Sequence, residues 1–273
     1  MAQLCFVTTC RGRRAHLEQS LPRLAAQPGT ECVVVDYGCP DGAGDWVEAN
    51  YPQVKVVRSG PSPWFELARA RNLGAQASAA PWLCFTDADA LVAADFAQVV
   101  LPLLQRGHYL RPRPQASDSS GMCICHREDF EAVGGYDAVL QGWGMEDKDL
   151  YFRLRLAGVE AGAFPARLVE MISHGGNLRL AHYRNKHTWK NSTMNLVYCR
   201  AKWDLMRLHG KDIAEAERTA LYQRISQAVL DAQQRGTSVQ LRVPVDSQES
   251  LSGAVLATSL LYELGAPPPQ KKN

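Results

Sequence analysis

Residues 80–90 constrain the fold more than any other stretch, because a short apolar run ends there at two aspartates. Residues 82–85 are apolar, and Asp87 and Asp89 follow with only Ala88 between them. Such a run is typical of a buried strand in a parallel sheet, and ligands bind beyond the carboxyl ends of these strands. Two neighbouring carboxylates repel each other, so a hard cation such as Mg²⁺ or Mn²⁺ suits this position. A solvated turn is the alternative for this stretch alone.

The chain before this stretch repeats a pattern of strand, loop and helix. Apolar runs and helical spacing predict strands over 4–9, 31–36 and 54–57, and helices over 16–24, 45–49 and 64–80. Three consecutive units of this kind predict an α/β fold with a parallel sheet of the nucleotide-binding type.

Polar residues follow the first two predicted strands. Arg11 and Arg13 lie in the loop after the first strand, and a guanidinium group matches phosphate oxygens, although a solvated basic turn explains this segment equally well. Asp36 ends the second strand, a position from which α/β folds contact a nucleotide base or ribose. The helix that leads to the aspartates carries Arg69, Arg71 and Asn72.

A second informative stretch covers residues 141–150. Gly142 and Gly144 flank Trp143 and permit a tight backbone that exposes the indole. Glu146 and Asp147 follow at the start of a predicted helix, where the helix dipole favours carboxylates. An exposed aromatic ring beside carboxylates suits a sugar, which offers an apolar face and hydroxyl groups. An acid-capped helix with an aromatic contact is the alternative.

The rest of the chain is less specific. His174 ends the apolar run of residues 169–172, and residues 179–190 form a basic loop that could fold over an anionic ligand. Helices are expected over 191–208 and 212–234, an edge strand over 239–245, a last helix over 249–264 and a disordered tail over 267–273.

Composition excludes some functions. The 273 residues have a formal net charge of +2, which gives no reason to expect nucleic acid as a partner. No apolar run approaches the roughly 20 residues of a membrane span, and the first charges follow the first apolar run, unlike a secretory signal. We therefore expect a cytoplasmic protein, with peripheral association at the inner membrane face as a further option. The eight cysteines are expected to be reduced and mostly buried.

The order of these motifs resembles that of the GT-A-fold glycosyltransferases of the family 2 type, over about residues 3–180. The matching segments are VTTCRGRRAHL, VVVDYGCPDGAGDW, FELARARNLGA and TDADA, and GWGMEDKDL and MISH resemble the β-1,4-galactosyltransferases. The resemblance implies a mixed, mostly parallel central sheet with a C-terminal helical extension. It also implies a catalytic domain over 1–198, divided into a nucleotide-binding half (1–105) and an acceptor-binding half (106–198), with the extension over 199–273.

The resemblance implies a metal-dependent, inverting transfer of a hexose from a UDP-sugar to a glycan or lipid-linked acceptor. Galactose and N-acetylgalactosamine are the favoured sugars. The implied roles are Asp147 as base; Trp143, Gly144 and Glu146 at the acceptor; Asp89 and His174 at Mn²⁺ or Mg²⁺, with Asp87 and Met171 as further ligands; and Thr8, Arg11, Arg13, Asp36, Arg69, Asn72 and Asp87 at the donor.

Two departures and two alternatives accompany this interpretation. Tyr37 replaces a frequent second aspartate, and the residues after Asn177 do not follow the galactosyltransferase pattern, so the donor sugar does not transfer from the family. A sugar-1-phosphate nucleotidyltransferase is one alternative, although its glycine-rich, lysine-bearing loop is missing after the first strand. A non-catalytic nucleotide-sugar-binding scaffold is the other. The C-terminal helices could also support a homo-oligomer.

Overall fold

The structure is a computed structural model that describes residues 2–114, 121–173, 180–251 and 254–265. It divides into two compact units. The first, here the sheet unit, comprises Met1–Ala138 and Glu146–Lys186, and the second, here the helical unit, comprises Val139–Met145 and His187–Asn273. Each unit is described by itself.

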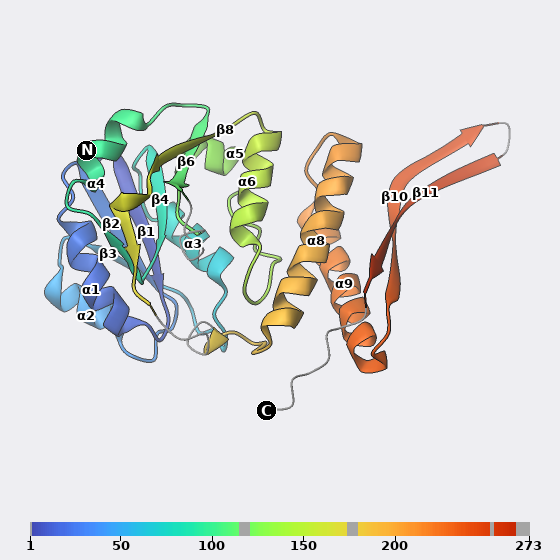
Figure 1. The fold of residues 1–273 in the computed structure, drawn as a ribbon, viewed down its shortest axis with the longest axis horizontal. Helices are drawn as coiled ribbons and strands as arrows, with labels where there is room; N and C mark the ends of the chain where they lie inside the picture. Colours follow the sequence, from blue (N-terminus) through green and yellow to red (C-terminus); the bar gives the residue numbers. More distant parts are fainter. Residues whose placement is uncertain (1, 115–120, 174–179, 252–253, 266–273) are drawn as a thin grey trace. The chain divides into compact units, whose positions relative to one another are not determined.

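A seven-stranded sheet forms the centre of the sheet unit, with the strand order β3-β2-β1-β4-β7-β6-β8 (Figure 1). The strands are β1 (Leu4–Cys10), β2 (Thr30–Asp36), β3 (Lys55–Arg58), β4 (Trp82–Asp87), β6 (His108–Arg113), β7 (Cys123–His126) and β8 (Glu160–Pro165). Strands β3, β2, β1 and β4 are parallel, and β7 is antiparallel to both of its neighbours. The prediction of a mixed, mostly parallel sheet is confirmed.

Helices cover both faces of this sheet. They are α1 (Arg14–Ala25), α2 (Ala43–Asn50), α3 (Leu67–Gln76), α4 (Phe96–Val100), α5 (Arg127–Ala132) and α6 (Glu146–Leu156), with short 3-10 turns η1 (Leu101–Leu103) and η2 (Ala166–Leu168). Alternate strand residues point to opposite faces, so two separate cores form. One packs Phe6 and Val34 against α1, α2 and α4, and the other packs Val7 and Val35 against α3 and α6.

A small second sheet lies directly after the two aspartates. Strand β5 (Ala90–Val92) pairs antiparallel with β9 (Val169–Met171), so that Ala90 lies opposite Met171. The amide of Ile172 also donates a hydrogen bond of 2.8 Å to the carbonyl oxygen of Asp89. The segment that leads to residue 174 is thereby fixed beside the aspartates.

The helical unit contains α8 (Thr188–His209), α9 (Glu215–Arg235) and a hairpin of β10 (Val239–Leu251) and β11 (Ala254–Leu264). The prediction of a final helix over 249–264 is wrong. Leu241 and Val243 are buried on β10, and on β11 Leu264 is buried while Leu261 is 59% exposed. This alternation suits a strand, and the neighbouring strand β10 supplies its hydrogen bonds, which the local sequence alone does not reveal.

Within the described part of the chain, no helix combines the length and the apolar character needed to cross a membrane. The predicted tail over 267–273 lies outside the described residues.

Candidate active site

The carboxyl ends of the parallel strands bring together residues that are far apart in the sequence. Cys10, Asp36 and Asp87 are the last residues of β1, β2 and β4, and these strands are parallel and adjacent. Their ends therefore share one edge of the sheet, where an open α/β sheet binds its ligands.

Arg71 is the centre of the site. Its side chain is 1% exposed, and it pairs with two carboxylates, Asp87 through Nη2 at 2.9 Å and Asp147 through Nη1. The guanidinium also lies 5.0 Å from the ring centroid of Tyr136. Arg71 comes from α3, Asp87 from the end of β4 and Asp147 from the first turn of α6. We refer to Arg71, Asp87 and Asp147 as the Arg71 cluster.

Gly121 closes this cluster from one side. A Cβ atom at this position would lie 2.9 Å from Arg71 Nη2, 3.1 Å from Asp87 Oδ2 and 3.4 Å from Asp147 Oδ2. A side chain at residue 121 would therefore press on all three charged groups. The glycine leaves space beside the two carboxylate oxygens that Arg71 does not bind.

The acids at the start of α6 have raised pKa values. Burial raises the pKa of Glu146 to about 8, and the charge of Asp147 adds to this effect. Burial also raises the pKa of Asp147, although Arg71 opposes the shift. Glu146 is consequently mostly protonated at pH 7, while Asp147 has an arginine to stabilise its charge. Two neighbouring carboxyl groups with different protonation are typical of acid–base sites.

Asp89 is held by a separate arginine. Its carboxylate accepts a hydrogen bond from Arg13 Nη1 at 2.8 Å, and its side chain is 9% exposed. Arg13 follows β1 and immediately precedes α1. Arg13 and Asp89 therefore lie side by side, while their roles at the donor and the metal stay predictions.

Other predicted donor residues are already engaged with the backbone. Arg11 donates to the carbonyl oxygens of Tyr37 and Ser62 at 3.1 and 2.9 Å. Asp36 accepts from the amides of Cys39 and Gly44 at 2.6 and 2.7 Å, so both of its oxygens stabilise the turn before α2.

Three further predicted donor residues have different surroundings. Asn72 exchanges two hydrogen bonds of 2.9 Å with the backbone of Tyr136, which fixes the loop beside Arg71. Arg69 is exposed and lies 3.7 Å from Glu66. Thr8 is fully buried, and its hydroxyl has no hydrogen-bond partner among the described residues. Their roles at the donor stay predictions.

The predicted metal ligands are described only in part. Met171 lies on β9 opposite Ala90, next to the aspartates, whereas His174 lies outside the described residues. Among the described residues, no group of three or more His, Cys, Asp or Glu side chains is arranged to hold a metal ion. The complete predicted ligand set therefore stays a prediction.

The predicted basic loop over 179–190 is described from residue 180 onward, and residues 180–186 belong to the sheet unit. The amide of Phe65 donates to the carbonyl oxygen of His182 at 2.9 Å, and the rings of Phe65 and Tyr183 lie 5.4 Å apart. Gly12 has a φ of +65°, and a Cβ there would lie 1.8 Å from His182 Nε2. The segment is thus in contact with the loop after β1.

Comparisons with known proteins agree with this geometry. Residues 5–121 match the family model described as glycosyl transferase family 2, and residues 108–175 match the one described as the N-terminal domain of galactosyltransferase. Polypeptide N-acetylgalactosaminyltransferase 8 of Drosophila melanogaster is 32% identical over 105 residues, 38% of this chain and 17% of the relative. The chain therefore matches less than a fifth of the length of that relative.

The chain contains a glycosyltransferase domain of the family 2 type, matched over residues 5–121.

Solved structures show the same GT-A fold as this glycosyltransferase domain. The mannosyltransferase PcManGT from Pyrobaculum calidifontis, in complex with GDP-Man and Mn²⁺, has a TM-score of 0.56 at 17% identity, over 87% of this chain and 76% of its own. TarS 1–349 from S. aureus, in complex with UDP, has a TM-score of 0.58 at 12% identity, over 84% of this chain and 71% of its own. The matches assign an enzyme class, glycosyltransferase, and give no support to a nucleotidyltransferase or a scaffold.

The predicted acceptor residues Trp143 and Gly144 belong to the helical unit, although they directly precede the glycosyltransferase helix α6. Asn195 on α8 donates to the carbonyl oxygens of Gln141 and Gly144 at 3.0 and 2.8 Å. Its Oδ1 accepts from the Tyr222 hydroxyl of α9 at 2.9 Å. The backbone of residues 141–144 is therefore fixed by α8, and the side chain of Trp143 is half-buried.

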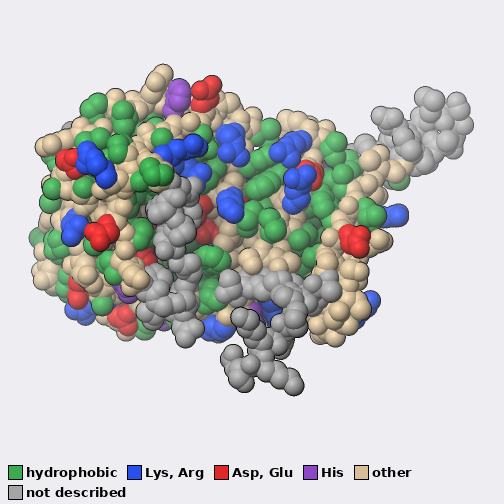
Figure 2. Space-filling view, viewed as in Figure 1, with side chains coloured by type: hydrophobic (Ala, Val, Ile, Leu, Met, Phe, Trp, Pro, Cys, Tyr) green, Lys and Arg blue, Asp and Glu red, His purple; other side chains and the backbone are tan. Residues whose placement is uncertain are grey.

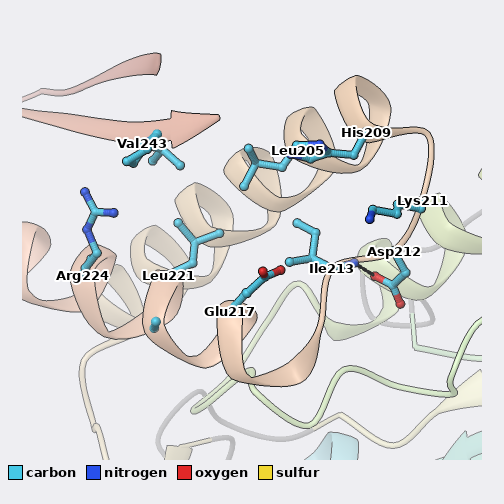
Figure 3. A pocket seen from close by; sticks show the side chains of 11 residues that line it. Leu205, His209, Lys211, Asp212, Ile213, Glu217, Leu221, Arg224 and Val243 are labelled. Atoms are coloured by element: carbon cyan, nitrogen blue, oxygen red, sulfur yellow. Dashed lines mark hydrogen bonds between the residues drawn. The ribbon is translucent and has the colours of Figure 1, made fainter. Parts of the chain in front are cut away.

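The helical unit also contains a cavity of about 370 Å³, lined by α8, α9 and β10 (Figure 3). Its lining includes the apolar residues Leu205, Leu221 and Val243 and charged residues such as Lys211 and Glu217. None of the predicted site residues of the glycosyltransferase domain is among those that line it.

Basic side chains do not all gather at one place. On the face drawn in Figure 2, Lys and Arg side chains occur at several separate positions, with acidic side chains among them. This distribution agrees with the small net charge of the chain.

Two residues of the candidate site, Arg71 and Gly121, were assigned no role from the sequence. A signal for Arg71 exists, because it shares the buried stripe of α3 with Ala68 and Ala75. A buried arginine needs carboxylate partners, and the acids at 87 and 147 were available. No sequence signal identifies Gly121, since its role comes only from close packing.

We predict that Glu146→Gln stabilises the protein in a pH-dependent way. Glu146 ionises near pH 4.5 in the unfolded chain but only near pH 8 in the folded protein, so folding takes up a proton between these values. The stability of the wild type therefore falls as the pH rises through this window, whereas neutral glutamine has no such loss. We expect the difference in Tm to grow from pH 4.5 to pH 8, to about 4 °C or more, and then to level off.

Thermal unfolding followed by circular dichroism from pH 4.5 to 9 measures this difference. Glu128→Gln is the matched control, because Glu128 is 69% exposed, and its Tm difference should stay constant. A constant difference for Glu146→Gln as well would contradict a raised pKa for Glu146.

Proposed function

We propose that this chain is a metal-dependent, inverting glycosyltransferase that moves a hexose from a UDP-sugar to a hydroxyl group of a glycan or glycolipid. The observation that carries the proposal is the Arg71 cluster, in which one buried guanidinium joins the strand-end Asp87 to the helix-start Asp147. This contact supports a single site for the proposed donor side and the proposed acceptor side of the reaction.

The donor side is proposed at Asp87 and Asp89. Carboxylate oxygens are the ligands that Mn²⁺ and Mg²⁺ prefer, and Arg13 already places a positive charge 2.8 Å from Asp89. Met171 and His174 are the further proposed ligands. The pairing of β5 with β9 holds Met171 beside the aspartates, and His174 follows three residues later in the sequence. A divalent cation bound there would stabilise the negative charge on the departing UDP. The carboxylates of Asp87 and Asp89 are thus of the ligand type that suits such an ion.

Arginines and the turn after β2 complete the proposed donor site. Arg13 would turn from Asp89 to the diphosphate once a cation neutralises that carboxylate, because guanidinium groups bind phosphate oxygens well. Arg11 holds the loop after β1 in place through the backbone of Tyr37 and Ser62. Thr8 and Asp36 are proposed at the uridine, and Arg69 and Asn72 at the edge of the donor site.

Asp147 is the proposed base. An inverting displacement needs a group that accepts the proton of the acceptor hydroxyl on the face opposite UDP. Arg71 binds Oδ1 of Asp147, and the glycine at 121 leaves space at Oδ2, which is the oxygen proposed to take the proton. The raised pKa of Asp147 makes it a stronger base than an ordinary aspartate.

The acceptor is proposed to contact Glu146, Trp143 and Gly144. Since Glu146 is mostly protonated at pH 7, its carboxyl group can donate a hydrogen bond to a sugar hydroxyl as well as accept one. Trp143 would stack on the apolar face of the sugar. The likeness of residues 108–175 to a galactosyltransferase model, and of part of the chain to an N-acetylgalactosaminyltransferase, supports galactose or N-acetylgalactosamine as the donor sugar.

Location and assembly belong to the proposal as well. A cytoplasmic enzyme with peripheral contact at the inner membrane face would meet a lipid-linked acceptor. The C-terminal helices α8 and α9 are the proposed surface for a homo-oligomer.

Asp147→Asn is the variant that tests the proposed function. We expect turnover of UDP-sugar to fall by about 10³-fold or more, because the amide cannot accept the proton, while UDP affinity changes less than threefold. Release of UDP in the presence of acceptor measures turnover, and circular dichroism checks that the variant is folded. Asp45→Asn, at an 84% exposed position, is the control. Turnover within tenfold of the wild type would remove Asp147 as the base.

Asp89→Ala is the variant that tests the proposed role of Asp89 as a metal ligand. We expect this variant to lose the part of UDP affinity that depends on Mn²⁺, at least about tenfold, because a proposed cation ligand is missing. Calorimetric titration of UDP with and without Mn²⁺ measures this dependence. Asp95→Ala is the matched control, since Asp95 is partly exposed and pairs with Arg167. An undiminished Mn²⁺ effect in Asp89→Ala would contradict the metal role.

A further inference from the structure

Two cysteines that the proposed reaction does not use lie at the carboxyl edge of the sheet. Cys10 is the last residue of β1, and Cys39 lies in the turn between β2 and α2. Their Sγ atoms are 3.9 Å apart, and the two residues are thiols rather than a disulfide. A strand end and a turn from different strand–helix units thus bring two thiols into contact.

The surroundings of the two thiols differ. The amide of Gly12 donates to Cys39 Sγ at 3.2 Å, and the hydrogen bond from Cys10 together with backbone amides at Asp41 and Ala43 lowers the pKa of Cys39 to about 6. The hydrogen bond with Cys39 and burial raise the pKa of Cys10. Cys39 is therefore mostly a thiolate at pH 7 and is half-buried, whereas Cys10 is a buried, protonated thiol.

We propose that Cys10 and Cys39 are a modification site for peroxides, in which Cys39 is oxidised first and Cys10 then closes a disulfide with it. The Cys39 thiolate attacks one oxygen of hydrogen peroxide, the O–O bond breaks, and Cys39 becomes a sulfenic acid while hydroxide leaves and is protonated to water. The Cys10 sulfur then attacks the Cys39 sulfur, its proton goes to the departing hydroxyl, and a second water leaves. Two thiols are oxidised and one peroxide is reduced to two waters.

The geometry permits the disulfide. The sulfur atoms must move from 3.9 Å to about 2.05 Å. Cys10 is fixed in the strand, but Cys39 lies in a turn and can supply the movement. The other six thiols are buried and therefore less accessible, and burial raises the pKa of Cys5 and Cys32 to about 12. Thiolate character and access, which favour oxidation, therefore coincide at Cys39.

The same pair touches the proposed donor site. Gly12, whose amide is bound to Cys39, lies between Arg11 and Arg13 and against His182. Closing the disulfide draws Cys39 toward Cys10 and changes this hydrogen bond. An effect on donor binding, which rests on the proposed function, is expected to follow.

Intact-protein mass spectrometry tests the proposal. The folded protein is treated with hydrogen peroxide, unfolded and alkylated, and we expect two fewer alkylated thiols, restored by dithiothreitol. Cys10→Ser should stop at a sulfenic acid on Cys39, which dimedone labels, and Cys39→Ser should show neither product. Cys32→Ala is the control and should behave as the wild type. Unchanged alkylation of the wild type, or loss of thiols that Cys39→Ser does not prevent, would overturn the proposal.

UDP binding in the same samples separates this inference from the proposed function. We expect the oxidised wild type to bind UDP with at least threefold lower affinity and dithiothreitol to restore it, whereas peroxide leaves the affinity of Cys39→Ser unchanged. If the disulfide forms without a change in affinity, the link to the donor site is overturned but the modification site stands. Failure of the reduced protein to bind UDP would instead contradict the proposed function.

Discussion

The buried guanidinium of Arg71 is the interaction on which the site depends. The Arg71 side chain is only 1% exposed. Moving a charged group from water into the protein interior costs free energy unless opposite charges and hydrogen bonds surround it. Asp87 and Asp147 supply both, and Tyr136 places its ring beside the same group. Removing one partner of such a group costs about 3–5 kcal/mol, so the three residues hold one another in place.

This constraint explains why the site forms where it does. Arg71 extends from α3, which packs on the same face of the sheet as α6, so a single side chain can reach both the end of β4 and the first turn of α6. Asn72, next to it, fixes the Tyr136 loop by two hydrogen bonds. Burial that stabilises the helix packing also raises the pKa of Glu146 and Asp147. Burial of the helix interface therefore both stabilises the fold and sets the acid–base properties of Glu146 and Asp147.

Much of this could be predicted from the sequence. Apolar runs and helical spacing predicted the parallel strands and the aspartates at the end of β4, because both depend on local periodicity. The partners of the arginines could not be predicted, since they depend on tertiary packing: Arg11 binds backbone carbonyls, and Arg71 rather than Arg69 reaches the acids. The strand predicted over 239–245 forms part of β10, but β11 was missed, because the apolar residues near 260 suit a helix until a partner strand is known.

The central claim is that Arg71 and Asp147 depend on each other, and a double-mutant cycle tests it directly. Urea unfolding would give the free energies of Arg71→Met, Asp147→Asn and the double variant. We predict that each single change costs about 3–5 kcal/mol, and that the double variant loses at least about 1.5 kcal/mol less than their sum. Costs that add within about 0.5 kcal/mol would contradict the account.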